Sequence, residues 1–137
     1  MEFQQYNYTA EVLEVNDGDT YTVRVNLGMR IYPETEIRML GIDTPETKKY
    51  KGRYRFAEEI DIGKKIAKWV RNRILGKQVR LKTHLDEDDK YGRLLAEIEY
   101  EVNGQWVNLN QQMLSLGFDK KTIQEKLESS TTIEIPE

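Results

Sequence analysis

Strict alternation of apolar and polar residues constrains the fold of this chain more than any other feature. Every second side chain is apolar over residues 20–27, and again over residues 94–102. A period of two is typical of a β-strand with one buried face. Weaker alternation predicts further strands over residues 8–15, 36–42 and 77–83. Five segments of this kind indicate a chain built mainly from β-strands.

One helical pattern interrupts the strands. Apolar residues recur at intervals of three and four at Phe56, Ile60, Gly63, Ala67, Val70 and Ile74, which predicts an amphipathic helix. Gly76 follows as a plausible stop. A shorter helix is expected over residues 108–116, ending at Gly117. This order predicts an α+β, mainly β fold: a five-stranded OB-fold-like barrel with two to three appended α-helices.

The length of 137 residues suits a single domain. We expect the barrel domain to span residues 1–121, followed by a short C-terminal helix or flexible tail over residues 122–137. No apolar run approaches the roughly 20 residues that a membrane-spanning helix needs, so no membrane partner is expected. The N-terminus lacks the pattern of a secretory signal. That is consistent with a cytoplasmic or mobile-element product, or with a secreted protein whose leader has been removed. A monomer is expected.

Cysteine and histidine counts restrict the chemistry. The chain has no cysteine and a single histidine, His84, which excludes disulfides, thiolate nucleophiles and zinc sites with two histidines. A catalytic triad would need His84 with Ser115, Ser129 or Ser130, and none of these serines has a nucleophile-like context. Any metal must therefore be a hard cation held by oxygen atoms. His84 is interpreted as a partly exposed residue at a strand end.

The basic residues are clustered although the net charge is −3. Residues 64–84 hold eight Lys or Arg and no acid, and residues 48–55 hold five more, with Tyr50 and Tyr54 between them. Such a flank suits a polyanion. A solvated basic helix face is the alternative, and for the helix alone it is the simpler interpretation.

Three short segments place charged residues at strand ends, where barrels usually build their sites. They are Asp-Gly-Asp-Thr at 17–20, Arg-Met-Leu-Gly-Ile-Asp-Thr-Pro-Glu at 38–46, and Asp-Lys-Tyr-Gly-Arg-Leu at 89–94. Taken singly, the first is a tight turn and the third a hairpin-like loop. Within the second, Thr44 and Pro45 resemble the start of a helix.

Arg38 is harder to explain as local structure. It lies between Ile37 and Met39 on a predicted strand, on the face that also carries Leu40 and Ile42. An arginine in such surroundings needs an anionic partner, either an internal carboxylate or a bound phosphate.

In order and spacing, the three segments resemble the thermonuclease family typified by staphylococcal nuclease, over about Tyr8 to Gly117. The resemblance implies one Ca²⁺ ion, ligated by the carboxylates of Asp19 and Asp43 and by the backbone carbonyl of Thr44. Asp17 would stand behind these ligands and orient a metal-bound water. Carboxylate, carbonyl and water oxygens are the ligands that Ca²⁺ prefers.

The resemblance also implies the catalytic and nucleotide-binding residues. Arg38 and Arg93 would clamp the scissile phosphate, and Glu46 would act as general base or position the attacking water. Lys90 and Tyr91 match nucleotide-binding residues. The implied activity is Ca²⁺-dependent hydrolysis of DNA and/or RNA at the P–O5′ bond, leaving 3′-phosphate ends, with single strands preferred.

One departure from the family pattern follows the second helix. Family members commonly carry tyrosines there that stack on the nucleotide, whereas this chain has Gly-Phe-Asp-Lys-Lys at 117–121. Each stacked base is worth about 1–3 kcal/mol, so nucleotide affinity is expected to be weaker or to come from elsewhere, with Tyr50 and Tyr54 as candidates.

Two other functions compete with the nuclease. The same barrel serves as a non-catalytic nucleic-acid- or protein-binding module in other proteins, although such modules typically lose the arginines and acidic ligands. An acidic calcium-binding domain built on residues 86–89 is weaker, because that run lacks the spacing of an EF-hand loop.

Overall fold

The computed structural model describes residues 6–49, 51–84 and 93–137. Its elements follow one another in the order β1 (Tyr6–Asp17), β2 (Thr20–Asn26), β3 (Glu34–Met39), α1 (Glu58–Ile74), β4 (Gln78–His84), β5 (Leu94–Val102), β6 (Gln105–Asn108), α2 (Leu109–Ser115) and α3 (Lys120–Glu128). No helix in the described ranges is long and apolar enough to cross a membrane.

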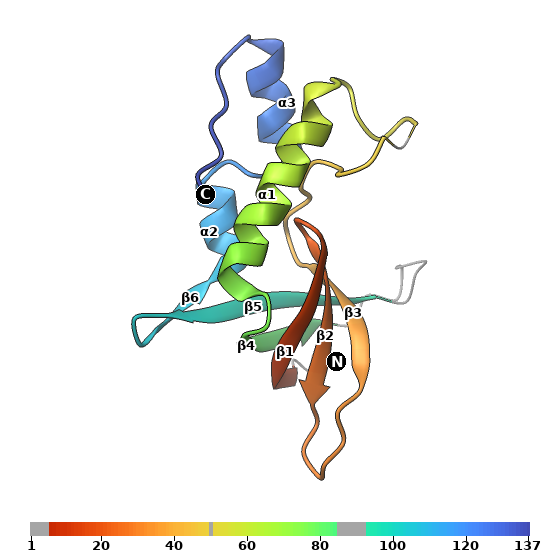
Figure 1. The fold of residues 1–137 in the computed structure, drawn as a ribbon, viewed down its shortest axis with the longest axis vertical. Coiled ribbons are helices and arrows are strands. Elements are labelled where there is room, and N and C mark those ends of the chain that lie inside the picture. The colour runs from red at the N-terminus through yellow and green to blue at the C-terminus, as the bar shows by residue number, and fades with distance from the viewer. Residues whose placement is uncertain (1–5, 50, 85–92) are drawn as a thin grey trace, which may run out of the picture.

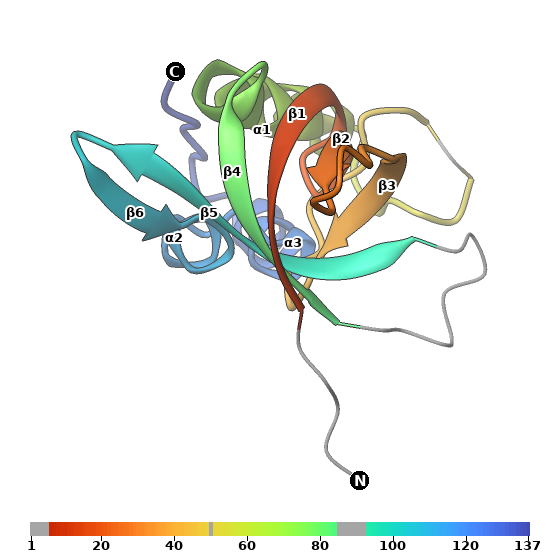
Figure 2. The same cartoon turned by 90° about the horizontal axis from the view of Figure 1, so that it is seen from below.

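The strands form a closed five-stranded barrel, as the alternation predicted. The sheet order is β3-β2-β1-β4-β5-β6, and a parallel pairing between β3 and β5 closes the barrel. Figure 2 shows the strands curving around a common interior, with β5 continuing outward to pair with β6. The predicted α+β, mainly β class with an OB-like barrel is confirmed. The strand β6 was not predicted, since its four residues are too few to show a period.

The apolar face of each strand points into the barrel. Val12, Val23, Ile37, Leu81 and Ile98 are all at most 1% exposed. Removing such side chains from water is the main stabilising contribution to a fold of this size.

The tip of the β2–β3 hairpin departs from the predicted pattern. Leu27 was expected to share the buried face, but β2 ends at Asn26 and Leu27 is 47% exposed. The backbone turns there through three consecutive residues with positive φ, Gly28, Met29 and Arg30. The tip projects away from the barrel (Figure 1), so Leu27 has no interior to enter.

The helix α1 covers one end of the barrel with its apolar stripe. Ile66, Val70 and Ile74 are fully buried, and Trp69 meets Phe118 edge to face at a ring-centroid distance of 5.1 Å. Gly76 has a φ of +73°, the left-handed conformation expected of a residue that stops a helix.

The interpretation of Thr44 and Pro45 as a helix start was wrong. Residues 42–46 have no regular structure, and α1 begins twelve positions later, after Ala57. The carboxylate of Asp19 accepts the backbone N–H of Thr44, and this tertiary hydrogen bond holds the irregular segment against the β1–β2 turn.

Both short helices begin at side-chain caps. Asn108 accepts the backbone N–H of Gln111 at the start of α2, and Asp119 accepts that of Thr122 at the start of α3. A side-chain hydrogen bond from Gln124 of α3 to Glu59 links α3 to the first turn of α1.

The end of the described chain comprises the helix α3 and an irregular segment. The helix α3 begins at Lys120 and buries Ile123, whereas residues 131–137 have no regular structure. Ile133 and Ile135 nevertheless pack against the core. A division of the chain at residue 121 stays a prediction.

Gly63 provides a test of how closely α1 approaches the irregular segment. A Cβ atom at this position would lie 2.3 Å from the carbonyl oxygen of Glu46 and 2.7 Å from that of Pro45. Alanine favours a helix over glycine by about 1 kcal/mol, but overpacking against backbone costs about 1–3 kcal/mol.

We therefore expect Gly63→Ala to lower the free energy of unfolding by about 1–2 kcal/mol in urea titrations. Asn72→Ala, at an exposed position of the same helix, is the control and should leave stability unchanged or slightly raised. A Gly63→Ala protein more stable than the parent would show that α1 does not pack closely on this segment.

Candidate functional site

Asp19 is the buried carboxylate at the centre of the site. It ends the turn between β1 and β2 and is 5% exposed. Its Oδ2 accepts the backbone N–H of Thr44 at 3.0 Å, and its Oδ1 accepts the hydroxyl of Thr20 at 3.1 Å. These bonds join the β1–β2 turn to the segment that follows β3.

Burial dominates the electrostatics of Asp19. Loss of solvent raises the pKa of the Asp19 carboxyl above its ordinary value, although the Arg38 charge and the Thr44 N–H both act to lower it. The folded chain therefore carries a carboxylate whose negative charge is incompletely offset.

Arg38 lies between two carboxylates. The register of β2 and β3 pairs Arg38 with Thr20, the residue next to Asp19. Its guanidinium is 2.9 Å from Oδ1 of Asp43 and 3.8 Å from Oδ2 of Asp19. The anionic partner that the sequence demanded is thus supplied from within the chain.

The charge on Arg38 is stabilised by its neighbours. Desolvation opposes that charge, but Asp19, Asp43 and Glu46 together outweigh it and raise the pKa of the guanidinium above its ordinary value. The effect of Glu46 places its carboxylate within electrostatic reach of Arg38. One arginine and three carboxylates therefore share a single region.

The segment carrying Asp43 and Glu46 is held tightly from one side. The hydroxyl of Thr47 donates to Asp17, and Gly18 lies so close to Thr44 that a Cβ atom there would be 2.8 Å from Oγ1. The segment is therefore fixed against the β1–β2 turn. Asp17 acts in this structure as an acceptor for Thr47, a contact that its sequence context did not indicate.

Lys120 is a site residue that sequence reasoning missed. Its Nζ is 3.3 Å from Oε1 of Glu46 and donates to the carbonyl oxygen of Arg53 at 3.0 Å. Lys120 lies in the Gly-Phe-Asp-Lys-Lys run that departs from the family pattern, and a separation of 74 positions hid its contact with Glu46.

The backbone of Arg93 lies near the site, because the strand that follows it pairs with β3. It directly precedes β5, whose Leu94 and Leu95 pair with Ile37 and Arg38 of β3, and its side chain is half-buried. A convergence of its guanidinium with that of Arg38 stays a prediction.

Several predicted residues lie outside the described part of the chain. These are Lys90 and Tyr91 of the nucleotide site, Tyr50, and the acidic run at 86–89. His84 is described, and it is the partly exposed last residue of β4, as expected.

The donor set at Asp19 and Asp43 suits a hard cation with an open coordination shell. Among the described residues no group of three or more acidic, histidine or cysteine side chains is arranged to hold a metal. The carboxylates of Asp19 and Asp43 are close enough to share Arg38, and Oγ1 of Thr44, the residue after Asp43, is buried without a hydrogen-bond partner. Carboxylates supplemented by a carbonyl and waters fit Ca²⁺.

Carboxylates and an arginine thus gather at the strand ends of a small OB-like barrel. The chain matches the staphylococcal nuclease homologue family over residues 36–135, well over half of its length. It belongs to this family. The matched range begins after Asp17 and Asp19. The assignment of these two residues to the site is therefore supported by the structure and the sequence motif, and not by the family match.

Two curated relatives are similar to this chain. The uncharacterized protein MJ1439 of Methanocaldococcus jannaschii is 30% identical, in an alignment covering 82% of this chain and 58% of the relative. The thermonuclease of Staphylococcus hyicus is 32% identical, covering 66% of this chain and 47% of the relative. The chain thus spans about half the length of the curated relatives it matches.

The raised pKa of Asp19 leads to a stability prediction. The folded chain binds this proton more tightly than the unfolded chain, so the contribution of Asp19 to stability falls as the pH rises above the ordinary range of an aspartate. At neutral pH without divalent cations, we expect Asp19→Asn to raise the free energy of unfolding by about 1 kcal/mol.

Asp61→Asn is the matched control, because the Asp61 side chain is 72% exposed. It should change the free energy of unfolding by less than about 0.5 kcal/mol. Urea titrations in a chelating buffer measure both variants. A destabilised Asp19→Asn protein would show that Arg38 and Thr44 fully offset the burial of this charge.

Proposed function

We propose that this protein is a Ca²⁺-dependent nuclease that hydrolyses DNA and/or RNA at the P–O5′ bond and leaves 3′-phosphate ends. The observation that carries the proposal is the arrangement of Arg38 between the carboxylates of Asp19 and Asp43, with Glu46 within electrostatic reach. Membership of the staphylococcal nuclease homologue family supports it.

Asp19, Asp43 and the backbone carbonyl of Thr44 would hold one Ca²⁺ ion. When bound, the ion supplies positive charge that stabilises negative charge developing on a phosphate. The Asp19 carboxylate is buried and its negative charge is only partly offset, so a bound cation would stabilise it. Asp17, hydrogen-bonded to Thr47, steadies the segment that carries the other ligands.

Arg38 and Arg93 would bind the scissile phosphate. A guanidinium presents a planar pair of N–H donors and remains charged at every working pH, so it fits two phosphate oxygens better than a lysine does. The surrounding carboxylates raise the pKa of Arg38, so the guanidinium is positively charged before substrate binds. Donors that the fold holds in place lower the barrier because they need little reorganisation during the reaction.

Glu46 would accept a proton from the attacking water or hold that water in position. It lies on the same irregular segment as Asp43, three residues further on, and its side chain is 18% exposed. Partial burial limits the positions that the carboxylate can reach, which favours a reaction that depends on orientation.

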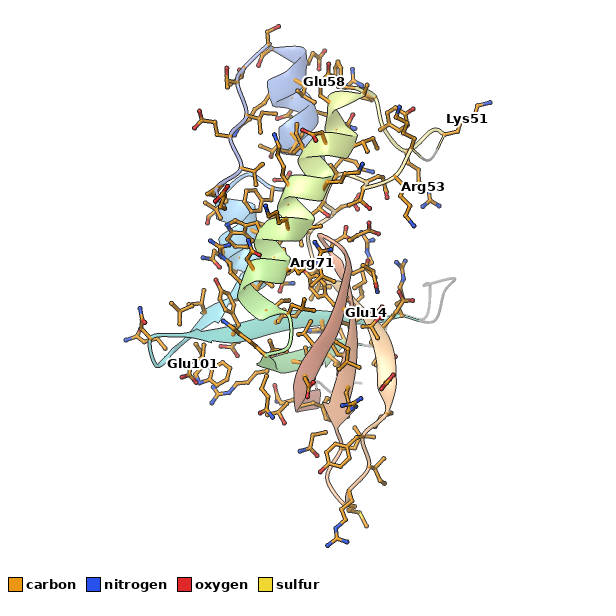
Figure 3. The ribbon with its side chains drawn as sticks, in the orientation of Figure 1. Glu14, Lys51, Arg53, Glu58, Arg71 and Glu101 are labelled. Carbon is orange, nitrogen blue, oxygen red and sulfur yellow. The ribbon has the colours of Figure 1, made fainter. Side chains whose placement is uncertain are left out.

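The proposed substrate is a single strand or a frayed duplex. Lys90 and Tyr91 would contact the nucleotide. The basic residues before α1, among them Lys51 and Arg53 on the projecting loop in Figure 3, would attract the phosphate backbone. We propose that the protein acts as a monomer.

The decisive assay incubates labelled single-stranded DNA and RNA with the protein, once with Ca²⁺ and once with a chelator. We expect cleavage only with Ca²⁺, and products whose gel mobility changes after treatment with phosphatase-active polynucleotide kinase but not with its phosphatase-deficient form, as 3′-phosphate ends require. Retarded migration without cleavage in both buffers would instead identify a non-catalytic nucleic-acid-binding module on the same barrel.

Arginine variants test the phosphate clamp. We expect Arg38→Ala and Arg93→Ala each to lower kcat by about 10² or more, since each removes donors that act on charge developing in the transition state. Arg24→Ala is the control, because Arg24 lies on the neighbouring strand β2, is exposed and pairs with Glu34. A variant of Arg38 or Arg93 with near-normal kcat would remove that arginine from the mechanism.

A further inference from the structure

We propose that Lys120, at the start of α3, is a positioning residue that holds the Glu46 carboxylate in place for catalysis. This inference rests on the proposed nuclease function and deepens it. Neither the motifs nor the family resemblance assigned a role to Lys120.

Lys120 contacts the segment after β3 at three points. Its ammonium group is 3.3 Å from the Glu46 carboxylate and donates to the carbonyl oxygen of Arg53 at 3.0 Å. Its backbone N–H donates to the carbonyl oxygen of Asp43 at 2.6 Å. Lys120 therefore contacts the stretch from 43 to 53 at Asp43, at Glu46 and at Arg53.

Lys120 is itself fixed by the way α3 is attached. Asp119 caps the helix by accepting the backbone N–H and the hydroxyl of Thr122, and Ile123 is 1% exposed within the core. One turn after Lys120, the side-chain amide of Gln124 donates to the Glu59 carboxylate at 2.9 Å. The ammonium group thus projects from a helix that cannot move freely.

Glu59 extends this attachment to the end of the irregular stretch. Its side chain is fully buried, and its Oε2 accepts the backbone N–H groups of Arg55 and Phe56. The helix α3 is consequently bonded to residues on both sides of the projecting loop that carries Lys51 and Arg53 (Figure 3). From this fixed helix the ammonium group of Lys120 meets the Glu46 carboxylate at 3.3 Å.

Burial gives this ion pair more weight than a surface pair would have. The side chains of Lys120 and Glu46 are each 18% exposed, so solvent and salt screen them less than exposed charges. Glu46 also lies within electrostatic reach of Arg38. The ammonium group of Lys120 is a second cation near this carboxylate, and it attracts Glu46 toward α3. This attraction limits the rotation of the Glu46 side chain toward Arg38.

The neighbouring lysine supplies a matched comparison. Lys121 has the same charge on the same turn of α3, but it is exposed. General attraction of nucleic acid by positive charge acts through both lysines, whereas positioning of Glu46 requires the contacts that Lys120 makes.

The kinetic experiment compares Lys120→Met, Lys120→Arg and Lys121→Met in the full chain with saturating Ca²⁺ and single-stranded DNA. We expect Lys120→Met to lower kcat about 10-fold or more with KM changed less than about twofold, because a misplaced catalytic group costs turnover rather than binding. Lys120→Arg should stay within about threefold of the parent, since it keeps the charge. Lys121→Met should leave kcat unchanged.

A double-mutant cycle shows whether Lys120 acts through Glu46. In a Glu46→Gln background, Lys120→Met should change the residual kcat by less than about twofold. An equal loss in both backgrounds, a loss shared by Lys121→Met, or no recovery by Lys120→Arg would each overturn the proposal.

Hydrogen exchange gives a readout that does not need activity. Amides of residues 46–49 and 51–56 should exchange at least about fivefold faster in Lys120→Met than in Lys121→Met, with thermal unfolding used to confirm that both variants fold. Unchanged exchange would overturn the attachment of this stretch by Lys120, even if the parent protein proves inactive. Inactivity of the parent with Ca²⁺ would by itself count against the proposed function only.

Discussion

The buried carboxylate of Asp19 is the interaction on which the site depends. It accepts the backbone N–H of Thr44 and lies beside Arg38, so one side chain joins the β1–β2 turn, the strand β3 and the segment after it. Burial of a charge is costly unless it is paired and hydrogen-bonded. Arg38 and the Thr44 N–H lie where they offset part of this charge, whereas Asp43 adds to it.

The barrel was largely predictable from the sequence, because a period of two is a local signal. Residues 94–102 alternate so regularly that the bounds of β5 follow directly, and Gly76 ends the helix that the spacing of three and four predicted. The prediction was wrong where a contact with a residue distant in sequence outweighed the local conformational preference. Thr44 and Pro45 resemble a helix start, but the Asp19 carboxylate binds the Thr44 N–H group in an irregular segment, and the helix begins at Glu58.

The candidate site was predictable only as far as its motifs reach. The guanidinium of Arg38 lies beside the carboxylates of Asp19 and Asp43, and the roles of these three residues stay predictions. Lys120 could not be found in this way, because no periodicity or spacing marks a lysine whose partner is 74 positions away. The roles of Arg93, Lys90 and Tyr91 stay predictions, the last two because they lie outside the described residues.

The long separation between Lys120 and Glu46 also bears on how the protein is made. A ribosome delivers the β1–β2 turn, β3 and the acidic segment early, but the lysine that meets Glu46 arrives only after β4, β5 and β6 have been produced. Contacts this distant in sequence form late, since the intervening chain must first be ordered. During synthesis the barrel strands can therefore pair before α3 is available to contact Glu46.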